Sequence, residues 1–278
     1  MCQQTRVAAA IPYYERFLAR FPDAAALAKA REDEVLALWS GLGYYSRARN
    51  LQKAAKQIVE TGAFPCSHDA IRELAGVGTY TAAAVASIAF GLPHAVVDGN
   101  VRRVLARLTN DDNVDAQPMA DRLLDRRDPA RWNQAVMELG ALVCVPGEPK
   151  CRECPLARQC AARKAGTQAD IPAKRVKPET EKHDRTLLVI RRGKKIQLVP
   201  SPRVKGFWDL PEQFPGARLG GSIGTFTHTI THRRYTFTVR QASGGASGRA
   251  RWFEENALGD IPLSTTAKKA LRFIYNRR

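Results

Sequence analysis

Four cysteines fall within 17 residues near the middle of the chain, at Cys144, Cys151, Cys154 and Cys160. Their C-x6-C-x2-C-x5-C spacing lets four thiolates surround one tetrahedral centre, either a zinc ion or an iron–sulfur cluster. Two disulfides are the alternative reading, and a cytosolic setting disfavours them. The spacing therefore predicts a metal or cluster site, around which three short loop segments must fold.

The pattern of apolar residues differs between the two sides of these cysteines. Residues 3–143 carry apolar side chains at helical spacing, with glycine and proline breaks near 21–23, 41–43, 62–67, 76–78, 91–93 and 128–129. The stretches 186–190, 196–199 and 225–239 are rich in β-branched and aromatic residues, and a helix is predicted over 264–275. We therefore expect an all-α domain joined by a polar linker to a smaller α+β domain.

The chain has a formal net charge of +17, concentrated towards its C-terminus. Residues 184–278 hold 18 Lys and Arg against 6 Asp and Glu, or +12, whereas residues 1–165 hold 22 against 18, or +4. This balance favours a polyanionic partner, most simply nucleic acid, and a solvated basic surface is the alternative. No apolar run approaches the roughly 20 residues that span a bilayer, and no signal-peptide pattern opens the sequence. A cytoplasmic location without a membrane partner is expected.

A glycine hairpin and a lone aspartate are the candidate functional elements of the helical region. In LAGVGTYTAAA, Gly76 and Gly78 precede an Ala-rich helix, whose positive N-terminal end and outward N–H groups can hold a phosphate. An ordinary helix–helix turn is the alternative. Twenty residues after Gly78, Asp98 lies in the stretch VVDGNVRRVLARL, which begins at Val96. It is either a helix cap or a catalytic carboxylate.

Together these motifs closely resemble the helix-hairpin-helix DNA glycosylases that carry an iron–sulfur loop, and within them the adenine DNA glycosylases of the MutY type. The resemblance rests on motifs in the expected order: MCQQTRV (1–7), WSGLGYYSRARNL (39–51), LAGVGTYTAAA (74–84), VVDGNVRRVLAR (96–107), the cysteine array, GFWDLPE (206–212) and HTITHRRYTF (228–237).

The resemblance implies a multidomain fold and a set of partners. It implies a helix-hairpin-helix glycosylase domain over 1–143 that lacks its first helix, a [4Fe–4S] cluster loop over 144–165, a linker over 166–183 and a Nudix-like 8-oxoguanine recognition domain over 184–278. A Nudix hydrolase motif is absent from the sequence, so nucleotide pyrophosphate hydrolysis is not expected. The implied partner of this monomer is duplex DNA containing adenine opposite 8-oxoguanine or guanine.

The implied chemistry is removal of the mispaired adenine after it is flipped out of the duplex. Breaking the glycosidic bond creates an oxocarbenium-like sugar, which a nearby carboxylate stabilises. Asp98 matches that carboxylate, Asn100 the polar residue beside it, and Tyr80 a tyrosine packed against the sugar. Bifunctional relatives carry a Schiff-base lysine at the Tyr80 position, so a monofunctional glycosylase is expected.

Further residues are matched to DNA contacts. Gln4 and Tyr44 match residues that insert into the duplex around the lesion, and Arg47 and Arg49 are candidates for phosphate contacts. In HTITH, residues 230–232 (Ile-Thr-His) occupy the place of a family segment usually written Phe-Ser-His. Thr231 and His232 therefore match the serine and the histidine, and they are the candidates for contacting 8-oxoguanine.

Three other functions compete with adenine excision. A thymine glycosylase acting on G·T mismatches shares much of the core, including a tyrosine at the position of Tyr80, but the long basic C-terminal region argues against it. A non-catalytic DNA-damage binding protein and a zinc-stabilised nucleic-acid module are the other two.

One departure from the family concerns catalysis. The family has a catalytic glutamate, which protonates adenine, two residues before the methionine of the M-x-Q-Q-T segment, and here that methionine is Met1. Either the start codon is misassigned and the natural protein is longer, or this is a truncated product; the intact later motifs favour the first.

We expect the polypeptide of residues 1–278 to bind lesion DNA better than it excises adenine, because it keeps Asp98 without that acid. A single-turnover assay on adenine opposite 8-oxoguanine should show a severe loss of excision. Excision as fast as that of an intact relative would contradict this expectation.

Overall fold

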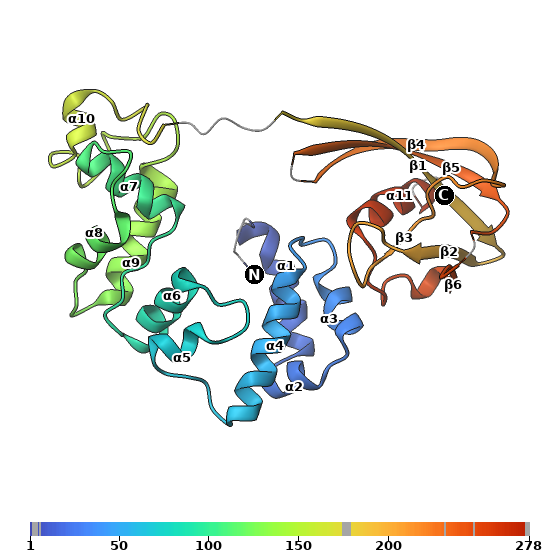
Figure 1. Ribbon diagram of the computed structural model, residues 1–278, viewed down its shortest axis with the longest axis horizontal. Helices are drawn as coiled ribbons and strands as arrows, with labels where there is room; N and C mark the ends of the chain where they lie inside the picture. The colour runs from blue at the N-terminus through green and yellow to red at the C-terminus, as the bar shows by residue number, and fades with distance from the viewer. Residues whose placement is uncertain (2–4, 6, 174–178, 231, 247, 276–278) are drawn as a thin grey trace. The chain divides into compact units, whose positions relative to one another are not determined.

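The computed structural model describes residues 1, 5, 7–173, 179–230, 232–246 and 248–275. Two of the predicted DNA contacts, Gln4 and Thr231, lie outside the described residues. The chain divides into two compact units, one formed by Met1–Glu60 with Pro178–Arg278 and the other by Thr61–Lys177. The helices expected as one domain over 1–143 are therefore shared between the two units (Figure 1).

Four helices open the first unit: α1 (Val7–Arg20), α2 (Ala24–Lys29), α3 (Glu32–Trp39) and α4 (Ser46–Thr61). The predicted break at 21–23 is confirmed, because the Asp23 carboxylate caps α2 by accepting a hydrogen bond from the Ala26 N–H at 2.7 Å. Aromatic side chains fill the space between the helices, with the Phe17 ring edge-on to those of Phe21 and Trp39.

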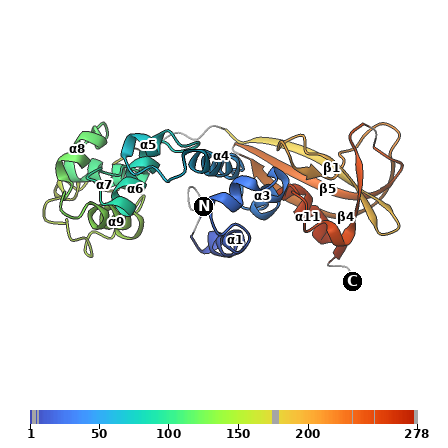
Figure 2. The ribbon, with the colours of Figure 1, turned by 90° about the horizontal axis from the view of Figure 1, so that it is seen from below.

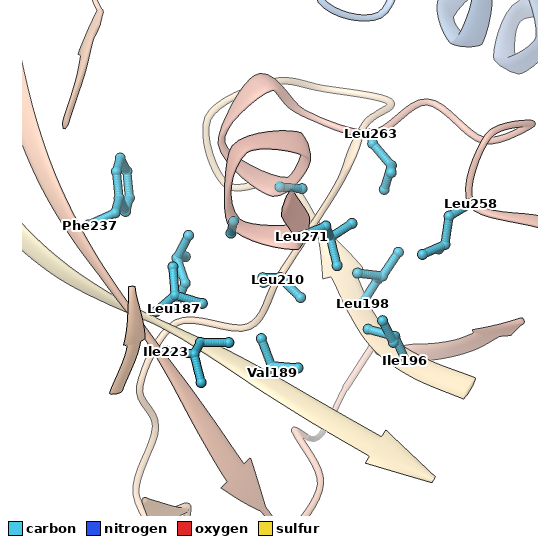
Figure 3. Packing of buried hydrophobic residues seen from close by; sticks show 13 residues of the cluster. Leu187, Val189, Ile196, Leu198, Leu210, Ile223, Phe237, Leu258, Leu263 and Leu271 are labelled. Atoms are coloured by element: carbon cyan, nitrogen blue, oxygen red, sulfur yellow. The ribbon is translucent and has the colours of Figure 1, made fainter. Parts of the chain in front are cut away.

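The C-terminal part of the first unit is a mixed sheet with one long helix. Its elements are β1 (Glu181–Arg192), β2 (Lys195–Pro200), β3 (Trp208–Asp209), β4 (Arg218–Ile230), β5 (Arg233–Ser243), β6 (Arg251–Glu254), the 3₁₀ turn η2 (Glu255–Ala257) and α11 (Thr265–Tyr275). The strand order is β3-β2-β1-β5-β4, with β6 also paired to β2, and the β1–β5 pair is parallel. Side chains of β1, β2 and α11, including Val189, Leu198 and Leu271, meet in its core (Figure 3).

The predicted α+β character of this region is confirmed, with two differences in boundaries. The apolar stretch 225–239 forms two strands, because β4 ends at Ile230 and antiparallel β5 begins at Arg233. The linker expected over 166–183 ends earlier, since β1 begins at Glu181. The reason is tertiary: residues 181–190 pair with 233–242 of β5, and this parallel pairing orders polar residues that carry no strand signal of their own.

The second unit contains α5 (His68–Arg72), α6 (Thr79–Phe90), α7 (Gly99–Thr109), α8 (Ala116–Leu123), α9 (Pro129–Glu138), the π-helical turn η1 (Leu139–Val143) and α10 (Ala161–Ala165). The predicted breaks at 76–78 and 91–93 fall between these helices, the break at 62–67 precedes α5, and the break at 128–129 marks the start of α9. In the described part of the chain, no helix combines the length and apolar character needed to cross a membrane. Within this unit, α7 contacts both α8 and α9, and the three helices lie together (Figure 2).

Candidate active site

Asp98 is both a helix cap and the centre of a polar cluster. Its Oδ1 atom accepts a hydrogen bond from the Val101 N–H at 2.7 Å, which makes it the N-cap of α7. Its other oxygen, Oδ2, accepts from the Asn100 side-chain amide at 3.0 Å. The carboxylate thus lies at the N-terminal, positive end of the α7 dipole.

A buried asparagine holds the segment that leads to Asp98. The Asn133 side chain is 0% exposed; its amide N–H groups donate to the His94 carbonyl at 2.9 Å and to the Ser87 hydroxyl at 2.8 Å, and its oxygen accepts from the Val96 N–H at 2.9 Å. The amide thus supplies hydrogen-bond partners to backbone groups of an extended segment that has no strand partner. The sequence analysis missed Asn133, whose only signal is a polar residue on the buried side of a helix.

Tyr80 lies in the first turn of α6, within electrostatic reach of Asp98. Burial raises the pKa of its phenol, and the negative charge of Asp98 raises it further. Its hydroxyl lies 3.8 Å from the Met137 sulfur. The phenol therefore stays neutral at physiological pH beside the carboxylate, and the three residues predicted as catalytic, Asp98, Asn100 and Tyr80, lie in one region of the second unit.

An arginine connects this cluster to the cysteine loop. Arg103 donates from Nη2 to the Asn100 side-chain oxygen at 2.9 Å and to the Gly140 carbonyl at 2.7 Å, and from Nε to the Cys144 carbonyl at 2.8 Å. A Cβ atom at Gly140 would lie 2.7 Å from the Asn100 Cβ, so α7 and η1 approach closely only because this residue is glycine. A continuous hydrogen-bonded path therefore joins Asp98 to the first cysteine.

The four cysteines line a single cavity, and each has a free thiol. Arg107, only 2% exposed, spans this loop: it donates to the Cys144 sulfur at 3.3 Å, to the Val145 carbonyl at 2.8 Å and to the Ile171 carbonyl at 2.7 Å. Across the described ranges, no three His, Cys, Asp or Glu side chains converge as the ligands of one metal ion would.

The walls of this cavity suit a negatively charged cysteine-ligated group. Arg107, Lys150 and Arg163 contribute positive charge to the lining. Gln168 also lines it, and its side-chain oxygen is buried without a hydrogen-bond partner. Rotating the amide by 180° would direct its N–H into the cavity, where a sulfur acceptor would satisfy it. The donor set and the orphaned amide therefore fit a cluster held by four thiolates.

The glycine hairpin has the expected open geometry. Gly76 has a φ of +78°, which favours glycine, and Gly78 is the N-cap of α6 without any side-chain cap. A Cβ atom at Gly78 would meet nothing within 4 Å. The start of α6 is therefore uncovered within its unit, as a backbone contact to phosphate requires.

The predicted DNA-inserting residue Tyr44 lies in the first unit. Its side chain is 59% exposed, and its φ of +48° is strained for a residue other than glycine. Arg47 lies over the Tyr44 and Trp39 rings and donates to the carbonyls of Met1 and Gly43. Arg47 thus braces the turn in this structure, and its contact with phosphate stays a prediction.

Two other predicted contacts already have protein partners. Arg49 forms an ion pair with Glu32 at 2.7 Å and donates to the Lys205 carbonyl. The His232 Nε2 atom lies 3.3 Å from a Glu181 carboxylate oxygen, at the start of β1. The turn between β4 and β5 is therefore attached to the first residue of the sheet.

Residues 1–127 match the family model described as HhH-GPD superfamily base excision DNA repair protein. The helical part of the chain is therefore similar to this superfamily. Adenine DNA glycosylases are among the curated relatives of the chain. That of Homo sapiens is 44% identical over 187 residues, that of Buchnera aphidicola (subsp. Baizongia pistaciae) 41% over 168, and that of Arabidopsis thaliana 34% over 257.

These matches cover 62%, 58% and 76% of this chain, but only 34%, 48% and 41% of the respective relatives. The chain thus spans less than half the length of these three proteins. Among solved structures, it resembles a thermostable thymine-DNA glycosylase (TM-score 0.55, 26% identity) and a non-covalent endonuclease III–DNA complex (TM-score 0.53, 25% identity). Each match covers 59% of this chain and 80% of the other chain.

Replacing Asp98 by asparagine should lower the pKa of Tyr80, because the carboxylate charge is removed, and leave it above the usual 10.0, because the burial remains. A phenol with a raised pKa contributes stability below pH 10 that is lost as the pH rises through its folded pKa. The measurement is the tyrosinate absorbance against pH, with Tyr80→Phe subtracted to remove the other tyrosines. An unchanged Tyr80 midpoint in Asp98→Asn would contradict the geometry.

Proposed function

We propose that this chain is part of a monofunctional adenine DNA glycosylase acting on adenine opposite 8-oxoguanine or guanine in duplex DNA, and that it supplies the DNA-binding surface and the sugar-stabilising carboxylate but not the acid that protonates adenine. The observation that carries the proposal is the Asp98 carboxylate, held at the start of α7 by the Val101 N–H and the Asn100 amide. The naming of relatives at 34–44% identity as adenine DNA glycosylases supports the choice of base.

Asp98 stabilises the positive charge that develops on the sugar as the glycosidic bond breaks. A carboxylate fixed before the reaction lowers the barrier because little reorganisation is needed to meet the new charge. Asn100 donates to the Oδ2 atom of Asp98 and itself accepts a hydrogen bond from Arg103. These two contacts fix the orientation of the carboxylate. The flipped nucleotide reaches this site from the duplex.

Tyr80 packs against the reacting sugar as a neutral phenol. Its raised pKa keeps it protonated, so it adds no second negative charge next to Asp98. A phenol, unlike an amine, forms no Schiff base with the sugar, and this supports a glycosylase that does not cleave the strand.

The four cysteines would hold a [4Fe–4S] cluster, and Arg107, which donates to the Cys144 sulfur, would offset part of its negative charge. When bound, the cluster would supply metal–thiolate bonds that order the loop over 144–160. Arg103 and Arg107 then connect the ordered loop to the helix that begins at Asp98.

The C-terminal sheet is proposed as a Nudix-like domain that reads 8-oxoguanine through the turn between β4 and β5. Thr231 and His232 are its candidate contacts, and the +12 balance of residues 184–278 supports an electrostatic grip on the DNA backbone. The alternatives remain a thymine glycosylase, as in the name of one structural neighbour, and a non-catalytic damage-binding protein.

A binding experiment tests the role of Asp98 without requiring turnover. Two duplexes are compared, each with 8-oxoguanine in one strand. In the other strand, the adenine nucleotide is replaced either by a cationic azaribose, which mimics the charged sugar, or by a neutral tetrahydrofuran. We expect the chain to prefer the cationic duplex, and Asp98→Asn to lose this preference while it still binds the neutral one. Equal preference in both proteins would contradict the assignment.

The same duplexes separate the alternatives. With guanine in place of 8-oxoguanine, binding should weaken if the sheet domain reads the lesion. A thymine glycosylase would instead prefer an opposite guanine, and a damage-binding protein would show no dependence of the azaribose preference on Asp98.

The purified chain should show broad visible absorbance and contain iron rather than zinc, and Cys154→Ser should lose both. Cys66→Ser is the matched control, because Cys66 is an exposed free cysteine outside the cavity. Zinc in place of iron, or unchanged iron content in Cys154→Ser, would contradict the proposed cluster.

A further inference from the structure

Phe207 belongs to the sheet region by sequence but to the helices by packing. It precedes β3, yet its ring is only 1% exposed among the side chains of α1–α4, 4.1 Å from the ring of Tyr45. The preceding Gly206 has a φ of +80°, and a Cβ atom there would lie 2.8 Å from Arg49 Nη2 and 3.1 Å from Leu36 Cδ1. The loop before β3 therefore inserts into the helical core.

Polar contacts accompany this insertion on the neighbouring residues. The Ser40 hydroxyl donates to the Leu263 carbonyl, and the Lys268 ammonium of α11 donates to the Ser40 carbonyl at 2.8 Å. The Tyr45 hydroxyl lies 3.2 Å from the Thr265 hydroxyl. Burial, together with the charges of Arg16 and Arg272, lowers the pKa of Lys268. We name the group Ser40, Tyr45, Phe207, Leu263 and Lys268 the clasp.

The clasp holds both ends of one strained turn. Between Ser40 and Tyr45 lie four residues, of which Gly41, Gly43 and Tyr44 have φ values of +107°, +77° and +48°. Glycine adopts positive φ values readily, but Tyr44 keeps its φ of +48° only where surrounding contacts impose it. Ser40 at one end and Tyr45 at the other both bind the C-terminal part of the chain, and Tyr44 points outward between them, 59% exposed.

We propose that the C-terminal sheet domain acts on the DNA through the helices as well as through its own surface: the clasp holds the 41–44 turn so that Tyr44 is presented in the conformation that inserts into the duplex. Phe207, Tyr45 and Lys268 are positioning residues for Tyr44. The DNA half of this inference rests on the proposed function; the clasp itself does not.

Two measurements on the full chain test the inference. Hydrogen exchange reports whether the amides of residues 40–49 are held, and DNA affinity is measured on a duplex with tetrahydrofuran opposite 8-oxoguanine. Phe207→Ala should speed exchange at 40–49 and weaken binding by on the order of tenfold, the scale of one aromatic–base stacking contact. Tyr44→Ala should weaken binding by the same factor, and the double variant should be no worse than either single variant.

Matched variants separate positioning from loss of fold. Lys268→Met keeps the packing of the stem but removes the donor to Ser40, so it should give the same changes at smaller amplitude. Ile223→Ala removes part of a buried side chain from the sheet core on β4, a strand that carries no clasp residue, and should destabilise the sheet without changing exchange at 40–49 or DNA affinity.

Opposite outcomes overturn the inference in distinguishable ways. Unchanged exchange at 40–49 in Phe207→Ala means that the clasp does not hold the turn. Affinity losses that multiply in the double variant mean that Phe207 and Tyr44 act independently. If Tyr44→Ala itself leaves DNA affinity unchanged, the proposed role of Tyr44 fails, and the inference falls with it while the exchange result still describes the clasp.

Discussion

Helix α7 carries the interaction on which the second unit depends. Its N-cap is Asp98, and its next turns carry Arg103 and Arg107, whose guanidinium groups hold the carbonyls and one sulfur of the cysteine loop. Because a helix is rigid over this length, the carboxylate and the cysteine cavity cannot move independently without breaking buried hydrogen bonds to charged groups. The close approach of η1 at Gly140 completes this arrangement.

This architecture connects the cysteine loop to the Asp98 carboxylate. The Cys144 carbonyl accepts a hydrogen bond from Arg103, which donates to Asn100, and Asn100 in turn donates to Asp98. A group held by the four cysteines would order the loop and thereby this path. Loss of such a group would leave four half-buried thiols beside the buried Arg107 guanidinium.

The first unit is built from both ends of the chain, because residues 1–60 pack with residues 178–278. The Phe207 ring completes a helical core that residues 1–60 would otherwise leave open, and the start of α11 caps the turn after α3 through Ser40. The proposed lesion-reading domain and the proposed inserting tyrosine are thereby parts of one body.

Much of the local structure follows from residue patterns. Glycine and proline breaks placed most helix ends, because these residues act on the backbone locally, and alternation in YTFTV predicted β5. The capping role of Asp98 was also predictable, since an aspartate that directly precedes a stretch with apolar residues at helical spacing is an N-cap signal. Local chemistry predicted these features because neighbours in sequence determine them.

Other features depended on contacts between distant residues, which no local pattern encodes. Asn133 looked like one polar residue in a helix, Phe207 like part of a strand motif, and Glu181 like linker, until the fold paired them with His94, Tyr45 and Arg233. The sequence by itself determined which residues could do chemistry: one capped carboxylate, four spaced thiols and an open glycine hairpin. Only the tertiary structure decided that one helix joins the carboxylate to the thiols and that the sheet region contacts both ends of the Tyr44 turn. The first depends on hydrogen bonds such as that from Arg103 to Cys144, 41 residues apart, and the second on contacts such as that from Ser40 to Leu263, 223 residues apart.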